Sequence, residues 1–219
     1  MFQIKICGIT NVEDAQMAAE AGADAIGLNF YAGSRRFVAT EQAARIALAL
    51  PSRVQKVGVF VNATAEEILR ICDAVGLDAI QLHGDELPRF NGELRGKPII
   101  KAFRLRGPSL ASVPDYLKES AAISDSVRMV LVDAFQPGAF GGTGERLDWQ
   151  ALGQWKSLIC VPLVLAGGLT AENVDAAISA TRPTAVDTAS GVEAAPGIKD
   201  ATKVREFVER AQSAFTKLV

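Results

Sequence analysis

Short apolar runs recur along the chain, and each is followed by a loop and then by a stretch whose apolar residues have helical spacing. Such apolar runs are typical of strands buried in a parallel sheet, and apolar positions three and four apart are typical of helices packed on it. The predicted strands are Phe2–Ile6, Ala25–Asn29, Lys56–Val61, Ala79–Leu82, Pro98–Phe103, Met129–Val132, Pro162–Ala166 and Thr184–Thr188. The predicted helices are Val12–Ala21, Thr40–Ala49, Ala65–Val75, Leu87–Leu94, Leu110–Ser120, Trp149–Leu158, Ala171–Ala180 and Ala201–Leu218.

The turns that lead from helix to strand reuse one pattern. Gly22 and Gly76 each follow a helical run, within the similar phrases Ala21–Ile26 and Val75–Ile80, and glycine there is typical of helix C-termini. Eight strand–helix units in 219 residues, with no linker between them, predict an α/β fold: a closed (β/α)8 TIM barrel in which residues 1–219 form a single domain. An open doubly wound sheet is the structural alternative, but it seldom runs through eight units without a domain break.

The first strand ends in a thiol. Cys7 closes the opening apolar run, and a helix start follows at once, with Thr10 or Asn11 as the candidate N-cap and Glu13 and Asp14 in the first turn. The sequence therefore places Cys7 at the mouth of a strand-to-helix loop.

Residues that could react with or bind a ligand occur just after the strands. In a (β/α)8 barrel these positions form the working face. The residues in question are Cys7-Gly8, Asn29-Phe30, Val61-Asn62, His83-Gly84-Asp85, Asp133-Ala134, Gly167-Gly168 and Ser190-Gly191.

Composition excludes several classes of protein. A hydrophobic content of 49% and a charged content of 22% are those of an ordinary globular protein. The net charge of −2 gives no electrostatic argument for binding nucleic acid or an anionic membrane. No apolar run approaches the ~20 residues of a membrane span, and the N-terminus lacks the layout of a secretory signal.

The cysteines indicate a reducing, cytoplasmic setting. The chain has three, widely spaced and without a C-x-x-C pair. Cys72 and Cys160 are expected to be buried apolar filler. The single histidine, His83, makes a His-rich metal site or a His-centred triad difficult to assemble.

Two glycine-containing loops predict a phosphate site. Gly167-Gly168 and Ser190-Gly191 follow the seventh and eighth predicted strands, where barrels of this type usually bind phosphate. Small residues let backbone N–H groups close around an anion, although one such pair alone would indicate only a tight turn. Gly141-Gly142-Thr143-Gly144, after the sixth strand, could line the same phosphate or hinge a lid.

Cys7 and Asp133 form a possible acid–base pair. They end the first and sixth strands and would face each other across the barrel mouth. A thiolate accepts a proton and a carboxylic acid donates one, as an aldose-to-ketose isomerisation requires. The alternatives are a buried filler role for Cys7 and an N-cap or ion pair for Asp133.

Three further residues have two open interpretations each. Arg36, in a loop after the second strand, is either a solvated surface group or a partner for an aromatic ring or carboxylate of the substrate. His83, after the fourth strand, is either a ligand of a substrate hydroxyl or a loop-holding hydrogen-bond partner. Asp187, in the eighth strand, either makes a structural hydrogen bond or positions substrate.

Several phrases together resemble the phosphoribosylanthranilate isomerase family, and the resemblance spans essentially the whole chain. Neighbouring phosphosugar barrels share the phosphate loops but not the opening cysteine phrase. The phrases are Lys5-Ile6-Cys7-Gly8-Ile9-Thr10, Gln81-Leu82-His83-Gly84-Asp85-Glu86, Gly141-Gly142-Thr143-Gly144, Leu165-Ala166-Gly167-Gly168-Leu169 and Ser190-Gly191-Val192-Glu193.

The resemblance implies specific roles. Cys7 matches the general base of the family, Asp133 its general acid and Arg36 the arginine that contacts the anthranilate moiety. The glycine pairs at 141–142 and 167–168, with Ser190-Gly191, match the residues that bind the substrate phosphate in the family. It further implies an Amadori rearrangement of a small phosphosugar, with no metal or organic cofactor. The sequence leaves the assembly open between a monomer and a homodimer.

The chain departs from the family pattern at two places. Arg35 stands where a proline usually precedes the anthranilate-contacting arginine, which makes the loop entry less rigid. Glu145-Arg146 follows Gly144, where a lysine is common, so no ligand role is assigned there.

Three other functions remain open on the sequence. A histidine-pathway isomerase would be expected to have a carboxylate where Cys7 stands. An indoleglycerol phosphate synthase needs a lysine at the mouth, whereas Lys5 lies inside the first strand. A phosphosugar-binding barrel without turnover would keep the glycine loops but would not need both Cys7 and Asp133.

Overall fold

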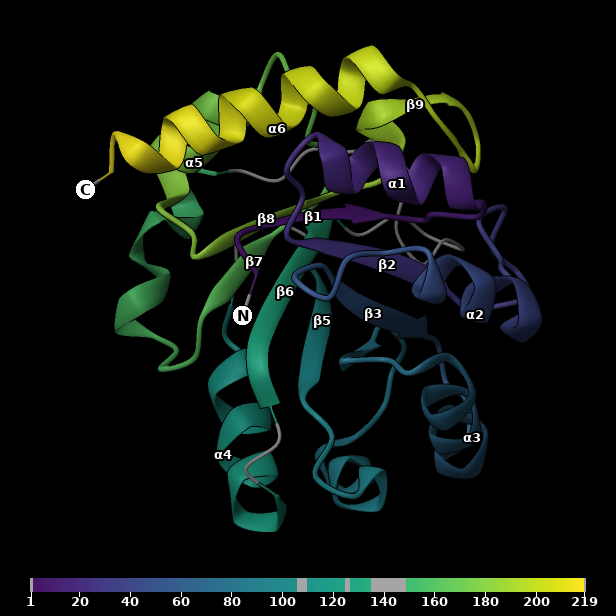
Figure 1. Ribbon diagram of the computed structural model, residues 1–219. Helices are drawn as coiled ribbons and strands as arrows, with labels where there is room; N and C mark the ends of the chain where they lie inside the picture. Colours follow the sequence, from purple (N-terminus) through teal and green to yellow (C-terminus); the bar gives the residue numbers. More distant parts are fainter. Residues whose placement is uncertain (1, 106–109, 125–126, 135–148, 219) are drawn as a thin grey trace.

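Eight parallel strands close into a barrel (Figure 1). The computed structural model describes residues 2–105, 110–124, 127–134 and 149–218. Consecutive strands pair in order, and β1 also pairs with β8, which confirms the predicted (β/α)8 barrel. The strands are β1 Ile4–Cys7, β2 Ala25–Asn29, β3 Gln55–Phe60, β4 Ala79–Leu82, β5 Ile99–Leu105, β6 Val127–Ala134, β7 Leu163–Leu165 and β8 Ala185–Thr188.

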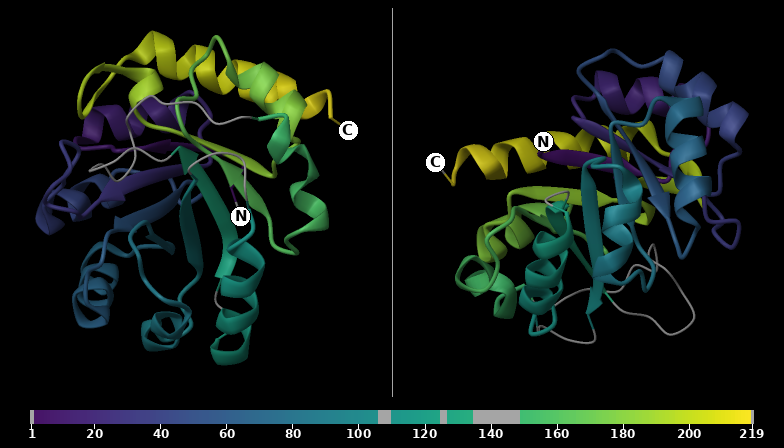
Figure 2. Two further views of the ribbon diagram at one scale, coloured as in Figure 1. Left: turned by 180° about the vertical axis from the view of Figure 1, so that it is seen from behind. Right: turned by 90° about the horizontal axis from the view of Figure 1, so that it is seen from below.

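Helices cover the outside of the barrel. In Figure 1 and the left view of Figure 2, α6 lies along the side formed by β1 and β8. The α-helices are α1 Val12–Glu20, α2 Thr40–Leu48, α3 Ala65–Val75, α4 Val113–Ile123, α5 Val174–Thr181 and α6 Ala201–Thr216. Among the described residues, no helix is both long and apolar enough to cross a membrane.

Two predicted α-helices are 3₁₀ segments instead. They are η1 (Pro88–Leu94) and η2 (Ala151–Ser157). Each contains an interior glycine, Gly92 or Gly153, which weakens α-helix propagation, and short stretches tolerate the tighter 3₁₀ winding.

The starts of α1 and α5 follow from asparagine side chains. Asn11, one of the two candidates for the N-cap, accepts the N–H of Asp14 at 2.7 Å. The helix predicted from Ala171 begins at Val174, because Asn173 folds the preceding turn: its Oδ1 accepts the N–H of Thr170 at 2.9 Å. This side-chain bond competes with helix formation over the preceding residues.

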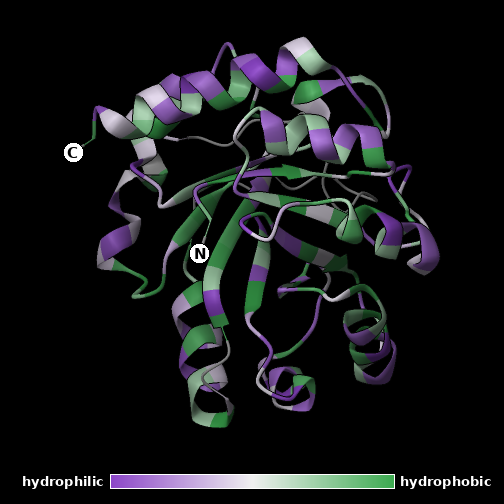
Figure 3. Ribbon diagram, in the orientation of Figure 1, coloured by the Kyte–Doolittle hydropathy of each residue, from purple (hydrophilic) through white to green (hydrophobic). Residues whose placement is uncertain are grey.

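Side chains of each strand alternate between two apolar cores. Ile4 and Ile6 point out toward the helices, whereas Met129, Leu131 and Val164 fill the barrel interior. The strands are accordingly mostly hydrophobic in Figure 3, while the helices carry both kinds of residue. Both strand faces are covered, which explains the near-continuous apolar runs in the sequence.

The two cysteines expected to be buried differ. Cys72 is buried in the outer core, as predicted, and burial raises the pKa of its thiol to about 11. Cys160 is exposed, so the prediction is wrong for this residue. The preceding residue, Ile159, is 5% exposed and fills the apolar site, which leaves Cys160 on the solvent side of the η2–β7 loop.

A small hairpin follows β8. The one-turn 3₁₀ segment η3 (Ser190–Val192) leads into β9 (Glu193–Ala195), which pairs antiparallel with β10 (Ile198–Lys199). The hydroxyl of Thr10 donates to the Gly197 carbonyl at 2.6 Å. This contact packs the hairpin against the loop that follows β1.

Candidate active site

One cavity occupies the mouth of the barrel, at the carboxyl ends of the strands. Its two lobes share Asp133, Asp187 and Ala189. The first lobe is lined further by Cys7, Asn29, Ser34, Arg36, Val59, Gln81 and His83. The second lobe is lined further by Ala166, Gly167, Gly168, Leu169, Thr188 and Ser190. The structure therefore brings most of the predicted site residues to one place.

Cys7 ends β1 with its side chain facing the cavity, and it is half-buried. The pKa of the Cys7 thiol is raised above its ordinary value, chiefly by burial. The charge of Lys5 opposes this rise, Asp187 adds to it, and Lys199 also opposes it. The neighbouring strand β2 makes room for the sulfur, because a Cβ added to Gly27, the residue paired with Cys7, would lie 2.5 Å from Cys7 Sγ.

Gly27→Ala is expected to displace the Cys7 sulfur and to lower kcat by about tenfold or more, because overpacking of this size costs roughly 1–3 kcal/mol and misplaces the reacting group. Turnover and thiol alkylation rates measure the effect. Gly92→Ala is the matched control, since its Cβ would meet only the Ile123 side chain, which is 50% exposed. Full turnover by the Gly27→Ala enzyme would contradict the tight fit.

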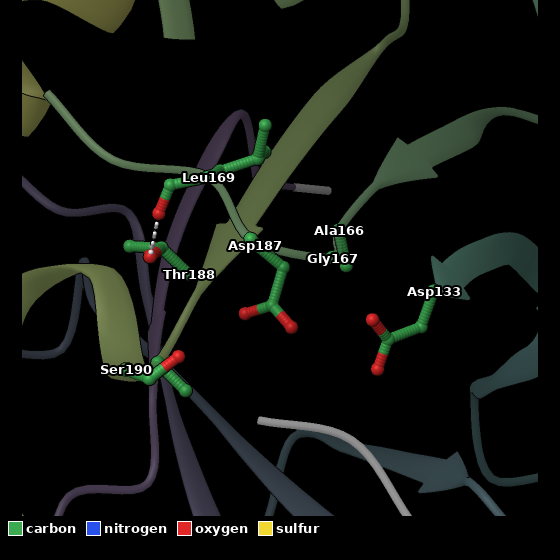
Figure 4. A pocket seen from close by; sticks show the side chains of 9 residues that line it. Asp133, Ala166, Gly167, Leu169, Asp187, Thr188 and Ser190 are labelled. Atoms are coloured by element: carbon green, nitrogen blue, oxygen red, sulfur yellow. Dashed lines mark hydrogen bonds between the residues drawn. The ribbon is translucent and has the colours of Figure 1, made fainter. Parts of the chain in front are cut away.

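Asp133 ends β6 on the same cavity, and its carboxylate points toward that of Asp187 (Figure 4). Its Oδ2 lies 3.5 Å from Nε2 of His83, which is too long for a hydrogen bond. Cys7 and Asp133 thus line a common space, and each has a side chain that can exchange a proton with a bound molecule.

His83 lines the cavity, and the structure shows one hydrogen bond of its ring. Its Nδ1 lies 2.8 Å from Nε2 of Gln81, two residues earlier on β4. Its Nε2 is buried and has no hydrogen-bond partner among the described residues. One ring nitrogen is therefore held by the protein, and the other is available to a ligand in the cavity.

Asp187 makes a structural ion pair. Its Oδ1 accepts from the ammonium of Lys5 at 2.8 Å, inside the barrel. Sequence reasoning assigned Lys5 no role. A lysine at an inward position of a buried strand was the signal, since lysine is rarely buried without a partner.

Arg36 is held by the hairpin after β8. Its Nε and Nη2 donate to the two carboxylate oxygens of Glu193, each at 2.7 Å. Lys199 also donates to Glu193, at 3.0 Å. Burial raises the pKa of Glu193, but the bonds from Arg36 and Lys199 outweigh it and hold the pKa below its ordinary value. Glu193 was not predicted as a site residue.

The glycine loops after β7 and β8 adopt special backbone geometry. Gly167 and Gly168 have φ values of 86° and 65°, which favour glycine. A Cβ on Gly191 would collide with the Leu169 carbonyl, so the two loops approach each other closely. Thr188 stabilises this approach by donating to the same carbonyl at 2.7 Å (Figure 4).

Two residues of the predicted phosphate site, Gly141 and Gly142, lie outside the described residues. Within the part of the chain that the structure describes, no three His, Cys, Asp or Glu side chains gather as potential metal ligands.

Comparison with known proteins agrees with this geometry. Residues 4–210 match the model of the N-(5'-phosphoribosyl)anthranilate (PRA) isomerase family. Relatives of that name from Geobacter sp. (strain M21) and Stutzerimonas stutzeri are 48% and 49% identical to the chain. These alignments cover 97% and 95% of this chain and 98% and 96% of the relatives.

Solved structures give the same result. The phosphoribosyl anthranilate isomerase of Thermotoga maritima superposes with a TM-score of 0.86 at 38% identity, covering 97% of this chain and all of that one. A structure in complex with reduced 1-(o-carboxyphenylamino)-1-deoxyribulose 5-phosphate gives a TM-score of 0.83 at 38% identity, with the same coverage. A third, described as monomers made from the dimeric Thermotoga maritima enzyme, gives 0.81 at 36%, again with that coverage. The chain belongs to the N-(5'-phosphoribosyl)anthranilate isomerase family.

Proposed function

We propose that the chain converts N-(5-phosphoribosyl)anthranilate into 1-(2-carboxyphenylamino)-1-deoxyribulose 5-phosphate in tryptophan biosynthesis, with Cys7 as general base and Asp133 as general acid. The observation that carries the proposal is that this thiol and this carboxyl line a single cavity at the barrel mouth. Glycine loops border the second lobe of that cavity.

The reaction needs one donated and one abstracted proton. Protonated Asp133 donates to the furanose ring oxygen, the C1–O bond breaks, and the anthranilate nitrogen lone pair forms a protonated Schiff base. The Cys7 thiolate then removes the proton from C2, which gives the enolamine. Tautomerisation adds a proton at C1 and releases one from the C2 hydroxyl, and the ketose results. No net oxidation or reduction occurs.

The two ends of the substrate match the two lobes of the cavity. Phosphate suits the lobe with Gly167, Gly168 and Ser190, where small residues expose backbone N–H groups. The anthranilate carboxylate suits the lobe with Arg36, which Glu193 holds in place. Gly191 supports the phosphate loop, while the roles of Gly141 and Gly142 rest on the sequence alone.

Arg36→Ala is expected to raise KM about 10- to 100-fold with a smaller change in kcat. The reason is that a charged hydrogen bond contributes roughly 1.5–3 kcal/mol to binding. Steady-state kinetics measure the split between KM and kcat. The neighbouring Arg35→Ala, at an exposed position, is the control and should change KM by no more than about twofold. An unaltered KM for Arg36→Ala would remove Arg36 from the binding site.

A turnover assay tests the function as a whole. Phosphoribosylanthranilate is generated freshly, and loss of its fluorescence is followed after addition of the purified chain. We expect the fluorescence to fall at a rate proportional to the enzyme concentration. The ketose product should form with the same mass as the substrate. Binding of the substrate without turnover would instead favour a non-catalytic phosphosugar-binding barrel.

The setting of the reaction is also inferred. We infer that the enzyme works in the cytoplasm, because its three cysteines, including the exposed Cys160, are free thiols, as is usual in a reducing compartment. Its assembly is a monomer or a homodimer, and light scattering coupled to gel filtration decides between the two.

A further inference from the structure

A fully buried lysine lies within the barrel. Lys5 is 0% exposed and is among the largest side chains that solvent does not reach. Much of its surroundings in the barrel interior is apolar, with residues such as Val57, Ile100 and Leu131. Removing an ammonium from water is costly unless a partner compensates it.

Asp187 is that partner. Lys5 and Asp187 are directly paired in register on β1 and β8, and the ammonium donates to Asp187 Oδ1 at 2.8 Å. A buried ion pair of this kind seldom adds net stability, because apolar residues of similar size would fill the space as well. Stability alone therefore gives no reason for a lysine at this position.

The position of Lys5 relative to Cys7 does give a reason. The two residues are two apart on β1, so their side chains point to the same, inward side of the strand. The charge of Lys5 lowers the pKa of the Cys7 thiol, and the charge of Cys7 in turn raises the pKa of Lys5. The ammonium thus makes its hydrogen bond to Asp187 and lies close enough to Cys7 to act on it by charge.

We propose that Lys5 is a positioning residue for the isomerisation: its ammonium is the fixed counter-ion of the Cys7 thiolate, and Asp187 holds that ammonium beneath the sulfur. The inference deepens the proposed function, because it rests on Cys7 being the general base. Lys5 itself does not need to touch the substrate, since it lies under Cys7 rather than in the cavity lining.

The other positively charged groups near Cys7 form ion pairs with a carboxylate. Lys199 on β10 and Arg36 after β2 both act on the sulfur, but both donate to the carboxylate of Glu193. Their positive charge is therefore largely offset.

On the remaining sides, Asp187 adds an opposing negative charge from β8. Asp133 and His83 line the same cavity from β6 and β4. Lys5 is thus the cation on Cys7's own strand, and its charge is divided between Cys7 and one carboxylate.

The arrangement predicts shifts of opposite sign. Lys5→Met removes the cation, so the titration midpoint of Cys7 should rise by about one pH unit or more, with about tenfold less thiolate at neutral pH. Asp187→Asn removes the competing carboxylate and frees the ammonium for the thiolate, so the midpoint should fall. If the pair had a purely structural role, the titration midpoint of Cys7 would shift in the same direction in both variants.

Thiol titration measures these shifts without turnover. The pH dependence of Cys7 alkylation by iodoacetamide is followed by mass spectrometry of the Cys7 peptide, in a Cys160→Ser background that removes the exposed thiol. Lys101→Met is the matched control: Lys101 is also buried and paired, with Glu86 at 2.7 Å, but its pKa is shifted by other groups than Cys7. The Cys7 midpoint should stay unchanged in this control.

The outcomes separate the two proposals. Unchanged midpoints in both test variants, or shifts of the same sign, overturn the role of Lys5. If Lys5→Met fails to fold, Asp187→Asn decides alone, because a midpoint that stays or rises overturns the inference. The acidic limb of kcat/KM should move with the alkylation midpoint. A limb that stays while the alkylation midpoint moves supports the Lys5–thiolate pairing but rejects Cys7 as the general base.

Discussion

A Cys7→Ser enzyme is expected to lose about 100- to 10,000-fold in kcat, the usual contribution of a general base. Serine keeps the size and place of the side chain, so the cavity and the fold should persist. Its hydroxyl, however, ionises far less readily than a thiol and cannot hold the negative charge whose cost Lys5 reduces at this position. The loss should therefore appear in kcat, with KM little changed.

Turnover of phosphoribosylanthranilate and thermal unfolding together check this expectation. Cys160→Ser, at the exposed cysteine, is the control and should keep full activity. If Cys7→Ser retains near-normal turnover and an intact fold, proton abstraction from C2 must be assigned to another group.

Asp133→Asn is expected to cause a loss of similar size, about 100- to 10,000-fold in kcat. The amide has nearly the same shape as the carboxyl group but has no acidic proton to give to the ring oxygen, so ring opening should become limiting. Because an amide does not titrate, the deficit should persist over the whole pH range in which the wild-type enzyme works.

A second aspartate provides the comparison for this variant. Asp175, on α5, forms a surface ion pair with Lys217 at 3.7 Å, and Asp175→Asn should leave kcat unchanged because such pairs contribute little. Pre-steady-state measurement of ring opening would locate the defect of Asp133→Asn. Equal rates for wild type and Asp133→Asn at every pH would exclude Asp133 as the acid.

The strands were the most predictable part of the fold. The predicted limits of Ala25–Asn29 and Ala79–Leu82 coincide with β2 and β4, because both faces of these strands are buried and most of their residues are therefore apolar. Helices were less predictable at their ends, since side chains such as Asn173 form local turns that compete with helix formation.

The positions of Cys7 and Asp133 were predictable, because each lies at the end of a strand and lines the cavity as expected; their catalytic roles stay predictions. The site was not predictable where function depends on pairing across the fold. Glu193 holds Arg36 from a position 157 residues away, and the hairpin that carries Glu193 has strands of three and two residues. Such short strands have no periodicity to detect, although Pro196-Gly197 marks their turn.

The pairing of Lys5 with Asp187 joins positions 182 residues apart, across the seam where the last strand of the barrel meets the first. We expect this link to form late, because closing so long a loop between β1 and β8 is costly before the intervening units are ordered. During refolding, the reactivity of the Cys7 sulfur should accordingly change late, together with seam closure. One thiol near the start of the chain would then serve as a chemical reporter of when the whole barrel has assembled.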